Sequence, residues 1–192
     1  MTNWQEYWLN HQRSLSVTTN ARPNLYTYDG LIKDIESSIG LNSSDIVLDS
    51  GCGTGELSKQ IRPKVKMVYA MDYSISMVDL AEQNLGVEIP VVWSDVRQQL
   101  PFNNNKFSKT LCVAVMQYIG YNDKQTMVQE LMRVTVPGGY VFIGDILPPE
   151  NKWKDDIYSY NLGDFQSLYK QAISIPSSYE PEQGRFHIII KK

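Results

Sequence analysis

Short apolar segments alternate with amphipathic segments along the middle of the chain, and this alternation limits the fold more than any other feature of the sequence. Apolar and polar residues in the longer segments follow helical spacing, and Pro63, Gly86 and the Pro137–Gly139 stretch mark their boundaries. Strands alternating with helices in this way imply βαβ units, and therefore a parallel sheet with helices on both faces. We expect strands at 46–48, 65–71, 91–93, 110–116 and 140–143, and helices at 31–39, 56–62, 74–84 and 123–134.

The last part of the chain has a different pattern. Residues 172–175 and 186–190 are two β-rich runs, joined by a connection that contains Pro and Gly and has no helical periodicity. This spacing favours an antiparallel hairpin at the sheet edge over another crossover. The sequence therefore predicts a three-layer α/β fold, mostly parallel, with an antiparallel C-terminal edge hairpin.

The length fits one domain. At 192 residues we expect a single unit, with an N-terminal helical cap or lid at 1–45, a core at 45–145, and a C-terminal helix and hairpin at 146–192. The cap is expected to cover the open end of the sheet.

Charge and composition exclude several classes of protein. The chain has 18 basic and 21 acidic residues, which gives no excess positive charge for binding nucleic acid. Its longest apolar run, Leu111–Met116, is far shorter than the roughly 18 residues of a membrane span, and residues 1–6 do not begin a signal peptide. Two cysteines, Cys52 and Cys112, form neither a zinc cluster nor a disulfide framework. We therefore expect a cytoplasmic protein with no bound metal and leave its oligomeric state open.

A glycine-rich turn follows the first expected strand, where ligands of open α/β sheets bind. The turn reads Gly51-Cys52-Gly53-Thr54-Gly55, so its third glycine comes one residue too early for the dinucleotide fingerprint G-x-G-x-x-G. Glu56 occupies the place of the last glycine and would repel a pyrophosphate. Asp49, at the strand end, is suited to a ligand with a positive amino group.

Two further carboxylates follow the next two strands. Asp72 can accept hydrogen bonds from both hydroxyls of a ribose, although a cap of the helix that begins near Ser74 is the alternative. Asp95 can accept from an exocyclic amine such as that of adenine, but taken alone it is as readily a turn residue. Together the three carboxylates indicate a ligand with an amino group, a ribose and a base.

These segments resemble the class I S-adenosylmethionine-dependent methyltransferases, a Rossmann-like family. The similarity covers residues 45–145 in the correct order. Ser50 stands where an apolar residue is common and Ser108 where aspartate is usual, and neither departure removes a cofactor contact. The matching segments are 47–55, 72–81, Asp95, 100–102, Phe107, Glu130, 133–134 and 137–139.

The resemblance implies a cofactor, S-adenosyl-L-methionine, and assigns residues to it. Gly51 and Gly53 would lie against its methionine part, with Asp49 near its amino group. Asp72 would bind its ribose, and Asp95 its adenine amine. The backbone of Val96 would read a ring nitrogen, and Val113 and Gln117 would contact the methionine part where the acceptor site begins. The full set of expected cofactor residues is Asp49, Ser50, Gly51, Cys52, Gly53, Asp72, Tyr73, Met77, Asp95, Val96, Val113 and Gln117.

The sequence marks the catalytic group and the acceptor contacts only weakly. An acceptor with a free amine lone pair needs no protein base, whereas a hydroxyl usually does. Three candidates for a base are Tyr118, Asp145 and His11. Asp145 could equally be a cap, His11 a surface histidine, and a tyrosine is a poor base. His187 is expected to lie in the hairpin away from the site. Acceptor contacts are expected from Tyr26, Tyr118 and Tyr121, whereas Trp4, Tyr7 and Trp8 have helical spacing that favours core packing over substrate contact.

The segment after the fourth strand also bears on the acceptor. It reads Ala114-Val115-Met116-Gln117-Tyr118 and lacks the Asn/Asp-Pro-Pro-aromatic signature of methylation at a nucleic-acid amine. We therefore expect transfer to an oxygen or nitrogen of a small-molecule or sugar-type acceptor. The alternatives are a non-catalytic scaffold that binds the cofactor, methylation of RNA or protein and, disfavoured by the glycine spacing, a nicotinamide oxidoreductase.

Overall fold

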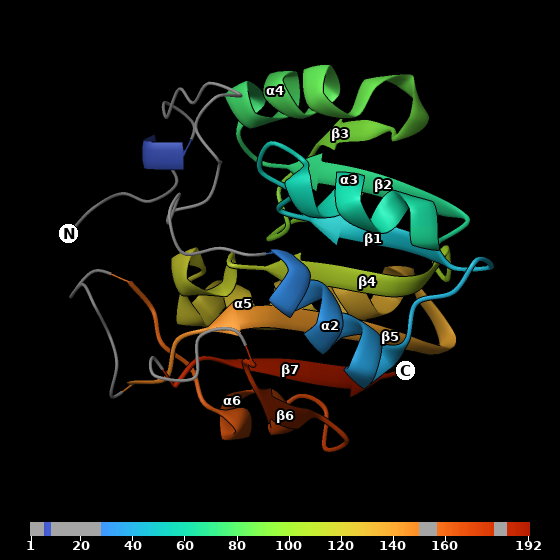
Figure 1. Ribbon diagram of the computed structural model, residues 1–192. Helices are drawn as coiled ribbons and strands as arrows, with labels where there is room; N and C mark the ends of the chain where they lie inside the picture. Colours follow the sequence, from blue (N-terminus) through green and yellow to red (C-terminus); the bar gives the residue numbers. More distant parts are fainter. Residues whose placement is uncertain (1–5, 9–27, 150–156, 179–183) are drawn as a thin grey trace.

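A computed structural model describes residues 6–8, 28–149, 157–178 and 184–192, and it is built around one seven-stranded sheet (Figure 1). The strand order is β3-β2-β1-β4-β5-β7-β6, in which β1 to β5 are parallel and β7 is antiparallel to both of its neighbours. The α/β class and the antiparallel C-terminal hairpin predicted from the sequence are confirmed. The strands are β1 (Ile46–Ser50), β2 (Met67–Asp72), β3 (Val91–Trp93), β4 (Phe107–Val113), β5 (Thr135–Ile146), β6 (Ile173–Pro176) and β7 (Phe186–Lys191).

Helices cover both faces of the sheet. In Figure 1, α2, α3 and α4 lie on the near face, while α5 lies behind the sheet and α6 sits beside β6. The helix α2 packs on a sheet face and adds Leu31 and Ile35 to a core that contains Phe142 of β5. The helices are α2 (Tyr28–Ile39), α3 (Glu56–Ile61), α4 (Ile75–Leu85), α5 (Tyr121–Val134) and α6 (Leu162–Gln166), and short 3-10 turns lie at Arg62–Lys64, Gly86–Glu88 and Met116–Tyr118.

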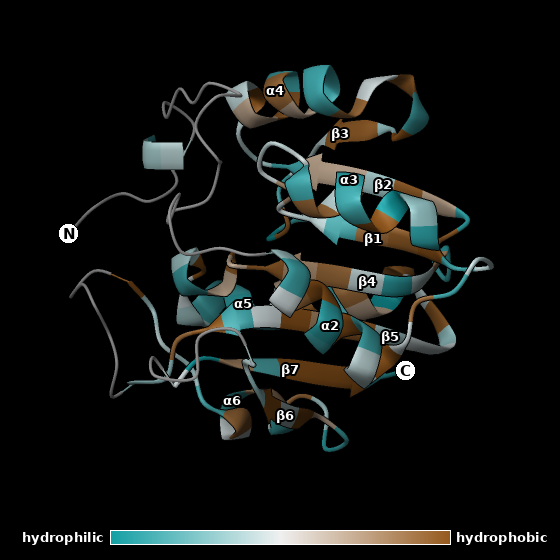
Figure 2. Ribbon diagram, in the orientation of Figure 1, coloured by the Kyte–Doolittle hydropathy of each residue, from teal (hydrophilic) through white to brown (hydrophobic). Residues whose placement is uncertain are grey.

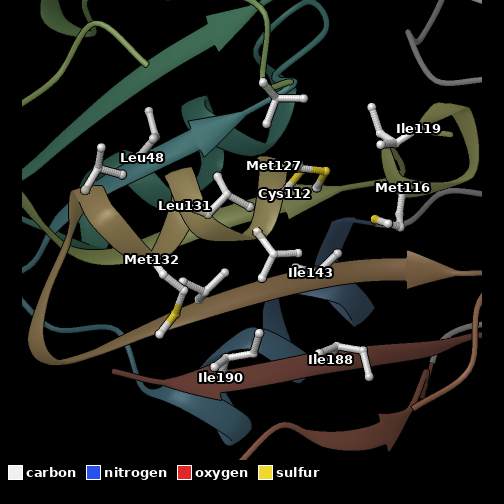
Figure 3. Close-up of a cluster of buried hydrophobic side chains, with 14 of the residues drawn as sticks. Leu48, Cys112, Met116, Ile119, Met127, Leu131, Met132, Ile143, Ile188 and Ile190 are labelled. Carbon is white, nitrogen blue, oxygen red and sulfur yellow. The ribbon is translucent and has the colours of Figure 1, made fainter. Parts of the chain in front are cut away.

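Two hydrophobic cores form because successive strand residues point to opposite faces. Val47 belongs to the core under α2, α3 and α4, whereas its neighbour Leu48 belongs to the core under α5. In Figure 3, Met127 and Leu131 of α5 lie over Ile143. Figure 2 shows the strands mostly in brown and the helices striped in brown and teal, as expected for a covered sheet. Within the described ranges, no helix is both long and apolar enough to cross a bilayer.

The largest differences from the sequence expectations are at the ends of β4 and the start of β5. β4 ends at Val113 because Ala114 turns into the left-handed region, with φ 58°, and a 3-10 turn follows. β5 begins at Thr135, so Pro137–Gly139 lies within the strand and not before it. Gly138 has φ 80° there, and a register shift between Phe107 and Lys109 accommodates the irregularity.

Candidate active site

The glycine turn lies beside the end of β2. The backbone N–H groups of Gly51 and Cys52 both donate to the carbonyl oxygen of Met71, at 2.8 and 2.9 Å. Gly51 has φ 80°, and a Cβ there would lie 2.3 Å from a methyl carbon of Val115. Only glycine therefore lets the turn after β1 approach the segment after β4 so closely.

Asp49 is a buried carboxylate at the end of β1. Only 2% of the residue is exposed, and the hydroxyl of Ser58 donates to its Oδ2 at 2.7 Å. Burial, helped by the negative charge of Asp72, raises the pKa of Asp49 to about 6, although the hydrogen bonds from Ser58 lower it. A buried anion with one strong donor favours a positively charged partner.

Asp72 connects the glycine turn to the start of α4. Its Oδ2 accepts the N–H of Gly53 at 2.8 Å and its Oδ1 accepts the N–H of Ser74 at 2.9 Å. Burial nevertheless raises the pKa of Asp72 to about 6, although these backbone hydrogen bonds lower it. A carboxylate offers about four acceptor positions, so the two backbone donors leave capacity for a diol.

Asp95 has a partner that the sequence reading missed. The guanidinium of Arg97 donates two hydrogen bonds to its carboxylate, from Nε to Oδ1 at 2.9 Å and from Nη2 to Oδ2 at 2.6 Å. The backbone N–H of Arg97 also donates to Oδ1. The guanidinium also lies 5.2 Å from the ring centre of Tyr73. An adenine amine at Asp95 would therefore share this carboxylate with Arg97. The spacing of two residues between Asp95 and Arg97 was the available signal, since Asp commonly accepts the backbone N–H two residues on.

The other expected cofactor residues differ in exposure. Val113 ends β4 and is half-buried, while Met77 and Val96 are buried. Ser50 is fully buried at the end of β1, opposite Met71 in register. Gln117 is 5% exposed, and its Oε1 has no hydrogen-bond partner among the described residues.

One expected acceptor residue lies in an apolar cluster at the carboxyl edge of the sheet. The ring of Tyr118 meets that of Trp8 edge-on, with 5.2 Å between centroids. Tyr118 also packs against Leu147 and Ile157, both 2% exposed. We call Trp8, Tyr118, Leu147 and Ile157 the aromatic wall. Tyr121 does not join it in the contacts described.

Tyr121 instead packs against the segment before α6. Its side chain is 56% exposed, its ring lies 5.2 Å from those of Tyr158 and Tyr160, and its hydroxyl donates to the carbonyl of Ser159 at 3.1 Å. Trp4, His11 and Tyr26 lie outside the described residues.

Asp145 is the candidate base whose surroundings are best defined. It is 2% exposed, and its Oδ2 pairs with Arg185 at 2.9 Å. Its N–H donates to Nδ1 of His187 at 3.0 Å, so the histidine expected away from the site contacts this position directly. A carboxylate already paired with a guanidinium is a poor choice for taking a proton from an acceptor.

The carboxylates of Asp49 and Asp72 fit a cationic nucleoside. Among the described residues, neither has a Lys, Arg or His partner, and loss of hydration raises the pKa of each. The ammonium and sulfonium charges and the ribose diol of S-adenosylmethionine would supply the missing cation and donors. Within the described ranges, no three His, Cys, Asp or Glu side chains are grouped to hold a metal ion.

Comparisons with known proteins agree with this geometry. The family model described as "Methyltransferase domain" matches residues 47–139. A malonyl-[acyl-carrier protein] O-methyltransferase of Serratia marcescens is 29% identical over 142 residues, covering 72% of this chain and 54% of the relative. A 2-phytyl-1,4-naphtoquinone methyltransferase of Trichormus variabilis is 29% identical over 146 residues, covering 71% and 58%. The chain thus spans about half the length of these curated relatives.

A solved structure extends the likeness to the whole fold. The N-methyltransferase NodS of Bradyrhizobium japonicum, in complex with S-adenosyl-l-homocysteine, superposes with a TM-score of 0.73 over 98% of this chain and 96% of NodS, at 14% identity. The glycine turn, the carboxylates at the ends of β1 and β2, and the family match lead to one conclusion. Residues 47–139 belong to the methyltransferase-domain family, and the chain has the Rossmann-like fold of the class I S-adenosylmethionine-dependent methyltransferases.

Proposed function

We propose that this protein transfers the methyl group of S-adenosylmethionine to a small-molecule acceptor. The observation that carries the proposal is the meeting of the glycine turn with two carboxylates, the buried Asp49 and the half-buried Asp72, beside the end of β4. The glycine turn allows a ligand to approach the backbone closely. The two carboxylates offer the same ligand negative charge that no Lys, Arg or His among the described residues neutralises.

The chain's own residues would hold the cofactor in an extended position along the strand ends. The backbone of Gly51 and Gly53 would lie against the methionine part, Asp72 would accept the ribose hydroxyls, and Asp95 and Val96 would meet the base. When bound, the cofactor supplies an electrophilic methyl group whose leaving group is a neutral thioether. The protein's contribution is then to hold acceptor and methyl group in line and to exclude water.

Proton transfer narrows the choice of acceptor. Asp145 is paired with Arg185, and Tyr118 packs against Trp8 in the aromatic wall. Neither is well placed to deprotonate a hydroxyl. We therefore favour an acceptor atom that arrives with an available lone pair, such as a carboxylate oxygen or a neutral amine nitrogen, which forms its bond to the methyl carbon as the carbon–sulfur bond breaks.

The aromatic wall supports an acceptor with an apolar or ring-shaped part. Trp8 and Tyr118 offer rings, and Leu147 and Ile157 offer apolar surface beside them. Such a wall suits a planar ring or the apolar face of a sugar unit. One of the two relatives is named for a naphtoquinone, which contains a planar ring. The other is named for a malonyl group on acyl-carrier protein, which has a carboxylate.

The test is a transfer screen with cofactor labelled in its methyl group. Small-molecule extracts, glycans, RNA and protein fractions are incubated with the protein, and we expect the label in the small-molecule fraction. Label only in RNA or protein would replace the proposed acceptor class. Calorimetry with S-adenosylmethionine is run beside the screen, because absence of binding would overturn the whole proposal.

A non-catalytic scaffold is the second candidate function. The ion pair between Asp145 and Arg185 favours it, because that contact already engages the only carboxylate among the candidate bases. Tight binding of S-adenosylmethionine without transfer to any fraction would support the scaffold over the enzyme.

A further inference from the structure

A buried polar chain joins α2, β5 and β7 next to the carboxyl edge of the sheet. It consists of Asp34, His187, Asp145 and Arg185. Asp34 is 6% exposed and the other three are at most 2% exposed. So many buried polar groups need a specific role, because each costs free energy unless it is fully hydrogen-bonded.

The contacts fix the hydrogen on His187. Its Nδ1 accepts the backbone N–H of Asp145 at 3.0 Å, so this nitrogen carries no hydrogen. Its Nε2 therefore carries the hydrogen and donates to Oδ2 of Asp34 at 3.1 Å. The N–H of Ser178 donates to the same oxygen at 2.9 Å. Asp34 thus selects the form of the imidazole that can accept from Asp145.

Asp145 needs this support because its backbone leaves the regular sheet. It has φ 61°, a left-handed conformation that a residue with a Cβ rarely adopts, and the register of β5 against β7 shifts between Ile143 and Ile146. His187 satisfies its N–H, while Nη1 of Arg185 donates to its carbonyl oxygen at 3.0 Å and pairs with its Oδ2 at 2.9 Å. His187 of β7 and Arg185, the residue just before β7, therefore hold both backbone polar groups of the turn.

The turn at Asp145 directs the chain toward the aromatic wall. Two residues later, Leu147 packs with Tyr118 and Ile157. The neighbouring exit from β4 is tied to the same place, because the N–H of Ala114 donates to the carbonyl of Gly144 at 3.0 Å. The position of Leu147, and with it that of Tyr118, depends on the conformation that β7 imposes on Asp145.

We propose that Asp34, His187 and Arg185 are positioning residues for the methyl acceptor. They hold the left-handed turn at Asp145 and thereby set the aromatic wall against which the acceptor packs. This inference rests on the proposed function, because it takes the aromatic wall as part of the acceptor site.

Protonation of His187 would release the turn. The charged groups around the imidazole are Asp34 from α2, Asp145 from β5 and, paired with Asp145, Arg185 just before β7. The strand β6 places Ile175 opposite His187 in register. A hydrogen on Nδ1 would point at the N–H of Asp145, so two donors would face each other and the hydrogen bond would be lost. Burial lowers the pKa of His187 more than Asp34 raises it. The folded protein thus binds this proton more weakly than the unfolded chain, and the support is present at neutral pH and lost as the pH falls below the ordinary pKa of histidine.

Two substitutions distinguish the roles of the two ring nitrogens of His187. His187→Asn places an amide oxygen near the position of Nδ1 and can still accept from Asp145, whereas His187→Gln reaches only toward Asp34. Thr110→Val is the matched control. It removes a buried hydrogen bond of 2.8 Å to Thr135, which joins the neighbouring strands β4 and β5 away from their carboxyl ends.

The first measurement is hydrogen exchange of the full-length protein at residues 144–149 and 116–121. We expect exchange to be about tenfold faster in His187→Gln and close to wild type in His187→Asn and Thr110→Val. In wild type, exchange corrected for its intrinsic rate should rise between pH 7 and pH 5, and this rise should be absent in His187→Gln. Equal behaviour of the Gln and Asn variants, or of His187→Gln and Thr110→Val, would overturn the proposal.

The second measurement uses the acceptor found in the transfer screen. His187→Gln should raise the KM for the acceptor about tenfold while kcat and the Kd for S-adenosylmethionine stay close to wild type. A loss of cofactor affinity of similar size would contradict a role confined to the acceptor. If wild type transfers no methyl group, the proposed function fails. The positioning role for an acceptor is then overturned as well, even if the exchange data show that the buried polar chain holds the aromatic wall in place.

Discussion

Asp72 combines an observed structural role with the ribose contact that we propose for it. Its two backbone hydrogen bonds close the glycine turn onto the start of α4, yet its pKa stays raised to about 6 because burial dominates. The N-cap of α4 is Ser74, so Asp72 does not form the cap that we predicted as its alternative role. The expected ribose contact stays a prediction, for which each carboxylate oxygen keeps a second lone pair.

We expect Asp72→Ala to weaken the binding of S-adenosylmethionine at least tenfold, or about 1.4 kcal/mol, because a bidentate partner of the ribose is lost. Isothermal calorimetry measures the change. Asp79→Ala, which changes an exposed aspartate on α4, is the control and should leave the affinity unchanged. Equal affinities of Asp72→Ala and wild type would remove Asp72 from the site.

The paired carboxylates also predict a pH dependence. Because the pKa of both Asp49 and Asp72 is raised to about 6, the cofactor-free protein binds more protons than the unfolded chain between about pH 4 and pH 6. These groups therefore lower the stability of the free protein as the pH rises through that window, and a cationic ligand offsets the cost. We expect the Kd for S-adenosylmethionine to be about tenfold lower at pH 7.5 than at pH 5. A flat profile from calorimetry across this range would contradict the assignment.

At the scale of elements, the pattern of apolar residues located most strands and helices. Burial repeats every second residue in a strand and about every 3.6 residues in a helix. The pattern failed where backbone geometry decides the boundary. Ala114 ends β4 early through a left-handed residue, and nothing in the apolar run up to Met116 signals it.

Only the local part of the candidate site could be recognised in the sequence. Asp49, Asp72 and the glycine turn are local in sequence and could be recognised there. The contact of His187 with Asp34 joins residues 153 positions apart, and the partnership of Asp145 with Arg185 depends on β7 lying next to β5. Such pairings follow from strand order and not from local spacing.

The turn between β1 and α3 offers a test at this scale. Gly51→Ala should destabilise the protein more than Gly138→Ala, because both positions have φ 80° but only the Cβ at 51 meets another group, 2.3 Å from Val115. We expect about 1 kcal/mol for the backbone strain alone and clearly more at Gly51. Urea unfolding of both variants checks the difference, and similar losses would mean that Val115 moves aside easily. Adding Val115→Ala to Gly51→Ala should recover only the part caused by the clash.

At the scale of the whole molecule, cofactor and fold should be thermodynamically linked. S-adenosylmethionine at about a hundred times its Kd should stabilise the protein by about 2.7 kcal/mol, or about 5–10 °C in Tm for a chain of this size. NAD should give no shift, because the third glycine of the turn comes too early and Glu56 follows it. Differential scanning calorimetry with each compound measures both, and a shift with NAD alone would reverse the choice of cofactor.

The position of β7 between β5 and β6 has a consequence for synthesis. The ribosome delivers β6 before β7, yet β6 touches the sheet only through β7, and Ile188 and Ile190 of β7 complete the core under α5. While residues 186–191 are still in the exit tunnel, β5 has an open edge, and Asp145 has neither His187 nor Arg185 to hold its turn. The nascent chain can therefore pair β1 to β5 early, whereas the turn at Asp145, next to the proposed acceptor site, gains its support only when β7 emerges and inserts.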